Sequence, residues 1–330
     1  MANKQAKEKF KTSIGGQALI EGIMMRGPEK DAIVIRQGEE LNIDIRPRKL
    51  VAKNSLWNWP ILRGMRGFFD SQVTGVKALM HSADLSPEES QEEPSKLDAW
   101  LEKKLGNEKF QKMIVGVAVF MGLAMSVGLF ILLPSFLVGL VAGFIESNLL
   151  RALLEGVIRI AIFMGYMIAV SRMKEMRRVF AYHGAEHKTI RCYEAGLPLT
   201  VENVRTMTRL HPRCGTSFLL VVMILSILVF AVASSVLQAV VPAIEQLRGN
   251  FSYNLIMMAF KLLLLPLVVG ISYEINRFVG RHDNWFTKII TAPGMWFQNF
   301  TTNEPDDSMI EVGIAAVEAV LPEKEGEDLW

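Results

Sequence analysis

The chain has 330 residues, half of them hydrophobic, and its formal net charge at pH 7 is +2. So small a charge excludes the strongly basic class of nucleic-acid-binding proteins, and we expect no nucleic acid among its partners. No apolar segment of the secretory-signal kind follows the polar residues 1–11, and the length leaves room for a membrane domain with one or two small soluble parts.

Residues 1–56 make up the first predicted unit, a small β-rich cytoplasmic part that contains many glycines. Segment 32–46 alternates apolar and polar residues around a turn at Gln37-Gly38-Glu39-Glu40, which predicts a β-hairpin. Segment 13–28 is dense in glycine, which allows close backbone approach and positive φ. Two interpretations stay open: either these glycines form tight turns, or the segment supplies substrate or supporting contacts to a site through Gln17, Glu21 and Arg26.

Residues 57–82 repeat aromatic and aliphatic side chains at helical spacing, with basic residues between them. This pattern predicts an amphipathic interfacial helix on the membrane surface or against the membrane domain, with a soluble core helix as the alternative. Residues 83–98 are acidic and polar, and they predict a solvated linker.

Residues 99–281 make up the predicted membrane domain, which gives the chain a mainly α-helical fold with four transmembrane helices. About 20 apolar residues cross the roughly 30 Å hydrocarbon layer. The segments of suitable length are 113–133, 152–170, 216–240 and 252–273. Pro134 interrupts the first segment and apolar residues continue to 145, so we expect one long helix that is kinked or tilted.

The basic residues predict the orientation of these spans. They gather before the first span, in the loop 171–215 and after the fourth span, whereas the connections 146–151 and 241–251 carry one arginine each. This distribution predicts a multi-pass membrane protein with four spans, with both termini and the loop 171–215 in the cytoplasm. Residues 282–330 then form a cytoplasmic interfacial segment and a C-terminal helix with a loose acidic tail.

Three charged residues lie inside the predicted spans, where a charge is costly and therefore informative. Glu155 and Arg159 are four residues apart, which predicts a local ion pair. Lys261 lies near the middle of the fourth span, and we expect it either to pair with a residue such as Glu155 or to face a polar cavity.

The loop 171–215 carries the residues with the clearest chemical pattern. His183 and His187 are four apart, so on a helix both imidazoles share a face and can occupy two corners of a tetrahedral zinc site. Glu186 lies beside the second histidine, where it can move a proton to or from a water molecule at the metal. The order His-x-x-Glu-His is the inverted form of a zinc-hydrolase signature. The alternative is an interfacial histidine pair that binds no metal.

His211 and Cys214 have the short spacing of a ligand pair at a turn. With His183, His187 and His211 as ligands the site is open and catalytic, whereas Cys214 as a fourth ligand would close it into a structural site. The expected cofactor is a divalent metal, with zinc favoured by these nitrogen and sulfur donors. Cys192 and Cys214 are the only cysteines, and in a cytoplasmic loop we expect them to be reduced thiols.

Four motifs, in this order along the chain, resemble the YqhQ-like family of bacterial multi-pass membrane proteins. The motifs are Gly15–Gly27, Tyr182–Lys188, His211–Ser217 and Thr302–Asp307. The resemblance covers nearly the whole chain and implies a multi-pass inner-membrane protein of a family of unknown function, predicted to be metal-dependent. It implies no substrate.

Three classes of function follow from these observations. The first is a bacterial inner-membrane protein with a cytoplasmic-face metal site that acts as a metal-dependent hydrolase on a membrane-associated substrate. The alternative is a non-enzymatic membrane assembly, insertion or scaffold factor with a structural His/Cys site. A transporter, suggested by Lys261 and Glu155, is a third class. The expected partners are the lipid bilayer and either other membrane proteins or a second copy of the chain.

Overall fold

The computed structural model describes residues 9–48, 51–52, 54–85, 107–141, 144–145, 147–247, 251–324 and 326–329. These residues form two compact units, one from residues 1–86 and 167–330 and the other from residues 87–166. The predicted acidic linker at 83–98 lies almost wholly outside the described residues.

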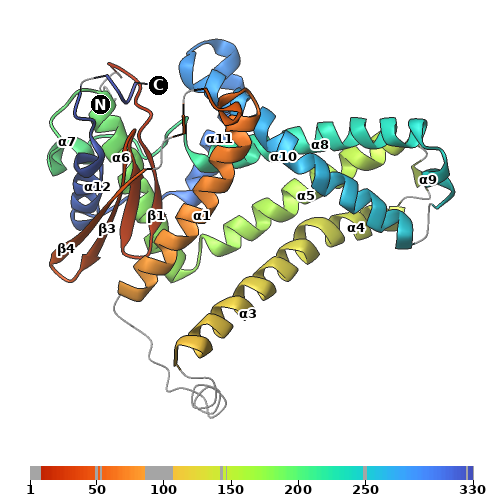
Figure 1. The fold of residues 1–330 in the computed structure, drawn as a ribbon, viewed down its shortest axis with the longest axis horizontal. Helices are drawn as coiled ribbons and strands as arrows, with labels where there is room; N and C mark the ends of the chain where they lie inside the picture. Colours follow the sequence, from red (N-terminus) through yellow and green to blue (C-terminus); the bar gives the residue numbers. More distant parts are fainter. Residues whose placement is uncertain are drawn as a thin grey trace. The chain divides into compact units, whose positions relative to one another are not determined.

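The N-terminal strands form a four-stranded antiparallel sheet in the order β1-β2-β3-β4 (Figure 1). Its strands are β1 (Gly15–Leu19), β2 (Gly22–Arg26), β3 (Lys30–Gln37) and β4 (Glu40–Pro47). The predicted β3–β4 hairpin is confirmed, with Gln37 paired to Glu40. The glycine-rich segment adds β1 and β2, which pair from Gly15↔Arg26 to Leu19↔Gly22.

Both faces of this sheet are covered, because its apolar side chains alternate between two cores as strand geometry requires. One core joins Ile23 and Val34 to α6 (Lys174–Glu194) and α12 (Asp307–Val320). The other joins Met24 and Ile33 to Ala78 of α1 (Leu62–Leu85). The glycine-bearing strand β1 is thereby held against α6.

Helix α1 begins later than the predicted start at residue 57. A short 3-10 turn, η1 (Leu56–Asn58), precedes it. Pro60 disfavours helical geometry in the residue before it, and Ile61 has a positive φ of 69°, so the regular helix starts at Leu62. Arg63 of this helix forms an ion pair with Glu274, and Gly64 packs on Tyr273.

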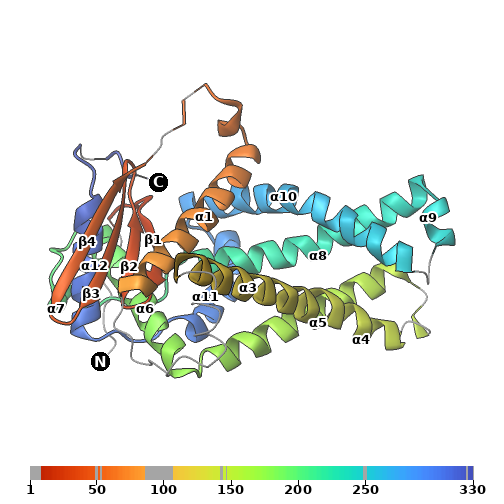
Figure 2. The same cartoon turned by 60° about the horizontal axis from the view of Figure 1, so that its bottom comes forward.

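The predicted mainly α-helical fold with four membrane-spanning helices is confirmed. The helices long and apolar enough to cross a membrane are Phe120–Val141, Leu149–Val170, Gly215–Val240 and Leu255–Arg281. The last two belong to α8 (Gly215–Val240) and α10 (Phe251–Arg281), which lie side by side (Figure 2). The protein is therefore a membrane protein.

The first span is one long helical run, as the sequence predicts. It consists of α3 (Asn107–Val127), a π-helical segment η2 (Gly128–Leu132) and α4 (Leu133–Val141). The second is α5 (Asn148–Val170). The π-helical segment lies directly before Pro134, so the irregularity predicted at this proline is a widened turn.

The chain after α6 continues through the short helices α7 (Val201–Arg205) and, between the last two spans, α9 (Ala243–Gln246). After the fourth span comes α11 (Trp285–Thr301), which packs on α8. The acidic tail, expected to be loose, is instead tied down in its described part. Thr12 pairs with Leu329 across an antiparallel bridge, and its hydroxyl donates to Oδ2 of Asp328 at 2.5 Å.

Candidate metal centre

Helix α6 places His183 and His187 on one buried face. Glu175 lies in its first turn and Arg191 in its last, which suits the helix dipole at both ends. The two imidazole rings are 4.4 Å apart between centroids, and both side chains are buried. The predicted helical pair is therefore present.

Cys214 joins this pair from the start of α8. It is the N-cap residue of that helix, and its sulfur accepts from the backbone N–H of Thr216 at 3.4 Å. One ligand atom each from His183, His187 and Cys214 lie within 4.8 Å of one another, and all three residues are buried. Two nitrogens and one sulfur at this spacing match the donor set of zinc.

The outer nitrogen of each imidazole is engaged by a backbone carbonyl. Nδ1 of His183 lies 2.7 Å from the oxygen of Thr301, and Nδ1 of His187 lies 2.6 Å from the oxygen of Arg209. A carbonyl only accepts, so each Nδ1 carries the hydrogen and each Nε2 is turned to the cluster. Metal-binding histidines are characteristically oriented in this way.

The inward nitrogens have different surroundings. Nε2 of His183 lies 3.2 Å from the sulfur of Cys214. Nε2 of His187 is buried and has no hydrogen-bond partner within the described parts of the chain. An unpartnered buried nitrogen beside a thiol and a second imidazole fits a metal ligand.

Glu186 approaches the same place from the next position of α6. Its Oε1 accepts from the backbone N–H of Gly16 at 2.9 Å, whereas its Oε2 is buried and finds no hydrogen-bond partner among the described residues. A Cβ on Gly16 would lie 2.6 Å from the oxygen of Met24 and 3.1 Å from Cδ of Glu186, so only glycine lets β1 come this close. Burial raises the pKa of Glu186.

The cysteine and one histidine shift each other's pKa toward the charged forms. Burial opposes the thiolate, but the imidazoles of His187 and His183 outweigh it and hold the pKa of Cys214 well below its ordinary range. Burial also opposes a charge on His183, yet the Cys214 thiolate raises the pKa of His183 to about 9. Both shifts favour the charged forms, and the thiolate is the form that a metal needs.

His211 lies beside the cluster with other partners. Its ring centroid is 5.5 Å from that of His187, and its Nε2 is 3.4 Å from Oε2 of Glu194. Glu194 is also ion-paired to Arg213. Burial, reinforced by Arg213, holds the pKa of His211 well below its ordinary value. The structure therefore brings three of the four predicted ligands together, and His211 as a ligand stays a prediction.

The three predicted supporting side chains have partners of their own. Arg26 is paired with Asp31 at 3.1 Å and with Asp70 at 2.7 Å. Glu21 is paired with Arg178 and accepts from the hydroxyl of Tyr182 at 3.2 Å, while the amide of Gln17 lies against Gly75. The glycine-rich segment reaches the cluster through the backbone N–H of Gly16 instead.

The intramembrane charges form one observed pair. Arg159 lies 2.6 Å from Glu155, as the spacing predicts. Lys261 is partly buried in α10, and its pairing with Glu155 stays a prediction.

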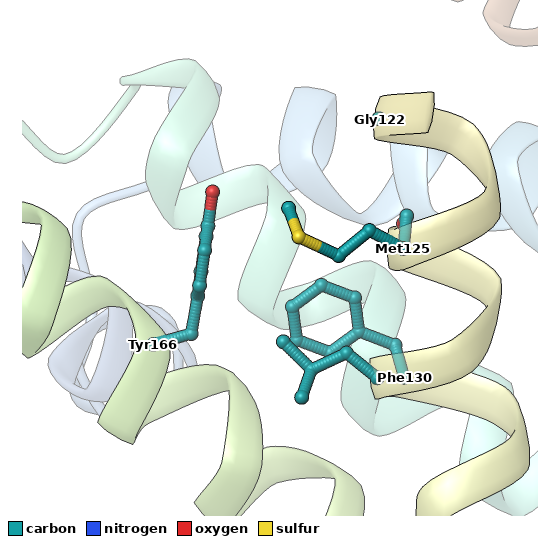
Figure 3. A pocket seen from close by; sticks show the side chains of 6 residues that line it. Gly122, Met125, Phe130 and Tyr166 are labelled. Carbon is teal, nitrogen blue, oxygen red and sulfur yellow. The ribbon is translucent and has the colours of Figure 1, made fainter. Parts of the chain in front are cut away.

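A pocket of about 180 Å³ lies in the same unit as that ion pair. It is lined by Gly122, Met125, Ser126, Leu129, Phe130 and Tyr166. Figure 3 shows Tyr166 across from Met125 and Phe130. The lining is mostly apolar, and none of these residues belongs to the metal cluster.

The sequence patterns did not identify several groups of the site, because these groups are backbone atoms. The carbonyls of Thr301 and Arg209 and the N–H of Gly16 exist at every ordinary position and carry no sequence signal. Two hints were present: Gly16 belongs to the glycine-rich motif, and Thr301 directly precedes the Thr302–Asp307 motif. Gln298, which contacts the segment that bears Cys214, had no signal.

The sequence comparisons agree with the resemblance. A family model described as "Protein of unknown function (DUF1385)" matches residues 59–323. The chain is similar to a Bacillus subtilis (strain 168) protein described as "Uncharacterized protein YqhQ", with 32% identity over 324 residues, which cover 96% of this chain and 94% of that relative. No solved structure matches. The chain therefore belongs to the DUF1385 family, the family of YqhQ-like proteins.

Proposed function

We propose that this protein is a zinc-dependent hydrolase of the membrane, with its metal held by His183, His187 and Cys214. The observation that carries the proposal is a pair of unpartnered atoms at the cluster. Nε2 of His187 and Oε2 of Glu186 are both buried, and neither has a hydrogen-bond partner in the described ranges. Such atoms are costly in a protein interior. A cation with a water molecule beside it would give both of them a partner.

The donor set favours an open zinc site. Two imidazoles and a thiolate suit zinc, and three protein ligands leave one position of a tetrahedron for substrate or water. A zinc ion there would supply Lewis acidity, polarising a carbonyl or phosphoryl oxygen. Were His211 a fourth ligand the site would be closed, and its contact with Glu194 at 3.4 Å argues against that arrangement.

Glu186 is the proposed general base. Its Oε1 is fixed by the N–H of Gly16 at 2.9 Å, so Oε2 is the atom that takes a proton from the attacking water. Burial raises the pKa of this carboxyl group, which brings it toward values at which a carboxylate both accepts and returns a proton near neutral pH.

The place of the site indicates the class of substrate. Cys214 caps α8, and the membrane-crossing segment of that helix begins at the next residue, Gly215. A ligand at the end of a span puts the chemistry at the membrane surface, so we propose a lipid-linked or membrane-embedded substrate at the cytoplasmic face of a bacterial membrane.

Elemental analysis of the full chain, purified in detergent, tests the metal centre. We expect about one zinc per chain in the wild type and its loss in His183→Ala, His187→Ala and Cys214→Ser. His282→Ala, at an exposed histidine, is the matched control and should keep its zinc. A wild-type protein without transition metal, or cluster variants with unchanged content, would refute the proposal.

A Glu186→Gln variant tests whether the site is catalytic. We expect it to retain zinc and to fail in complementing a strain that lacks the protein, because the amide cannot take a proton. Glu175→Gln, at an exposed position of the same helix, should complement fully. Full complementation by Glu186→Gln would favour the scaffold alternative, in which the His/Cys site is structural.

One observation favours a second candidate, thiol-based acyl transfer. The sulfur of Cys214 lies 3.2 Å from Nε2 of His183 at the N-terminus of a helix, which is the setting of an activated cysteine nucleophile. The thiolate would attack an acyl carbon, and His183 would give its proton to the leaving group. This candidate predicts that Cys214→Ser, one of the variants made for the elemental analysis, fails to complement the strain that lacks the protein. It also predicts that the wild type functions without a bound metal.

A further inference from the structure

The segment that bears Cys214 has little regular structure of its own. Between α7 and α8, residues 206–214 form turns and bends. Nevertheless Cys214 must lie beside two histidines of α6 for the cluster to exist. Contacts with other parts of the chain must therefore hold the backbone of this segment in place.

Gln298 of α11 makes that contact with all three hydrogen-bonding groups of its side-chain amide. Its Oε1 accepts from the backbone N–H of His211 at 2.7 Å, and its Nε2 donates to the carbonyl of His211 at 2.7 Å. The same Nε2 donates to the hydroxyl of Ser217 at 2.7 Å. His211 and Ser217 stand three residues before and after Cys214, so the amide joins both sides of the ligand.

The side chain is fully buried, with 0% of its surface exposed. An amide has one acceptor and two donors, and here each of them is used. A carboxylate of the same size would lose both donors, and a methionine of similar length would lose all three contacts. Few other side chains fit this place.

The same face of α11 serves the other side of the cluster. Gly294 lies one turn before Gln298, and a Cβ there would come within 2.6 Å of Cβ of Ser217, so the helix can approach α8 only with glycine at this position. Thr301 lies three residues after Gln298 and its carbonyl receives Nδ1 of His183 at 2.7 Å. One helix face thus contacts His183 and both residues that flank Cys214, namely His211 and Ser217.

We propose that Gln298 is a positioning residue of the metal centre, which holds the Cys214 segment so that the thiolate meets His183 and His187. The inference rests on the proposed metal site. Gln298 touches neither the metal ligand atoms nor substrate, and it acts through the backbone of His211 and the hydroxyl of Ser217.

Cobalt substitution of the full chain in detergent tests the inference. Cobalt bound to a thiolate gives a charge-transfer band that reports the Cys214 bond itself and does not follow general stability. We expect Gln298→Met and Gln298→Glu to weaken cobalt and zinc binding about tenfold or more, and to lower this band per bound cobalt. Asn299→Asp is the matched control, since it makes the same chemical change at the adjacent exposed amide, and it should match the wild type.

A milder variant covers the case in which replacing Gln298 prevents folding. Ser217→Ala removes one of the three hydrogen bonds and should weaken metal binding by a smaller factor in the same direction. Wild-type affinity and an unchanged band in Gln298→Met, or in Ser217→Ala where the former does not fold, would overturn the positioning role and leave the metal centre standing. A wild type that binds no cobalt would overturn both.

Discussion

His183 holds its proton more tightly than an ordinary histidine does. Burial alone would release that proton, but the thiolate of Cys214 raises the pKa of His183 to about 9 from an ordinary 6.5. The imidazoles of His187 and His183 outweigh burial in turn and hold the pKa of Cys214 well below its ordinary range. Between the ordinary value and about 9, the metal-free site therefore keeps a proton on His183.

Zinc binding should accordingly release protons in a pH-dependent way. A ligand must be deprotonated to bind metal, so near neutral pH zinc displaces the proton that His183 holds. The affinity for zinc should rise with pH up to about 9 and level off above it. Titration calorimetry in two buffers of different ionisation enthalpy measures the release. Equal release on both sides of that pKa would contradict the expectation.

The sequence predicts which side chains could bind a metal at this site. It predicts their arrangement in space only in part. The spacing of His183, Glu186 and His187 fixes their common helix face through the helical repeat. Cys214 is identifiable by its chemistry, but whether it or His211 faces the pair depends on a turn. In the structure that turn sends Nε2 of His211 toward Glu194, a buried carboxylate whose position depends on tertiary packing.

At the scale of elements, the first two spans share an interhelical polar contact. Pro134 has no N–H to offer the carbonyl four residues earlier, that of Phe130. Arg159 of α5 donates to that carbonyl at 2.8 Å, and Glu155 accepts both from Arg159 and from the hydroxyl of Ser135 at 3.0 Å. Because Pro134 offers no N–H to the Phe130 carbonyl, this carbonyl can accept from Arg159 and so link the first span to the second.

A double-mutant cycle tests this coupling. Arg159→Met should destabilise the wild type, because it leaves the Phe130 carbonyl unpaired. In a Pro134→Ala background the new N–H can serve that carbonyl, so the same change should cost less, by about 0.6–1.7 kcal/mol. Thermal unfolding of the four proteins in detergent gives the coupling. Additive effects of the two substitutions would show that Arg159 does not serve the proline-exposed carbonyl.

Long elements with a strong pattern were predicted well, and short ones less well. Hydropathy and length define the four spans, because a membrane imposes both. The strands β1 and β2 were hidden in a segment whose glycines weaken the strand pattern. Those glycines serve contacts between distant parts of the chain, such as Gly16 with Glu186, and no local pattern encodes such a contact.

At the scale of the whole molecule, the two ends of the described chain meet at the end of α6. The N–H of Thr12 donates to Oε1 of Glu194 at 2.9 Å, and the N–H of Ser13 donates to the carbonyl of Asp328 at 2.5 Å. The hydroxyl of Thr12, which is buried, also donates to the carboxylate of Asp328. Glu194 in turn pairs with Arg213, in the segment of Cys214.

Asp328→Ala should therefore destabilise the protein although only two residues follow this position in the sequence. It removes the carboxylate that accepts from the buried Thr12 hydroxyl at 2.5 Å and leaves only the longer contact with the Asp328 carbonyl at 3.4 Å, at a cost of about 1–3 kcal/mol. Glu327→Ala is the neighbouring control and should change stability by less than about 0.5 kcal/mol. Thermal unfolding of both variants measures the two changes in stability. Equal effects would show that the Asp328 carboxylate makes no specific contribution to stability.

The residues that surround the candidate metal centre are far apart in the sequence, so the ribosome makes them at different times. Thr301, whose carbonyl orients His183, is synthesised 118 residues after it. At roughly 5–20 residues per second, the ribosome needs about 6–24 s for that stretch. Cys214 is made early in this interval, and for the rest of it Gln298 and Thr301 do not yet exist. Under the proposed function, the three ligands are therefore synthesised before the groups of α11 that orient them, and the arrangement of the centre described here is complete only when α11 has been translated.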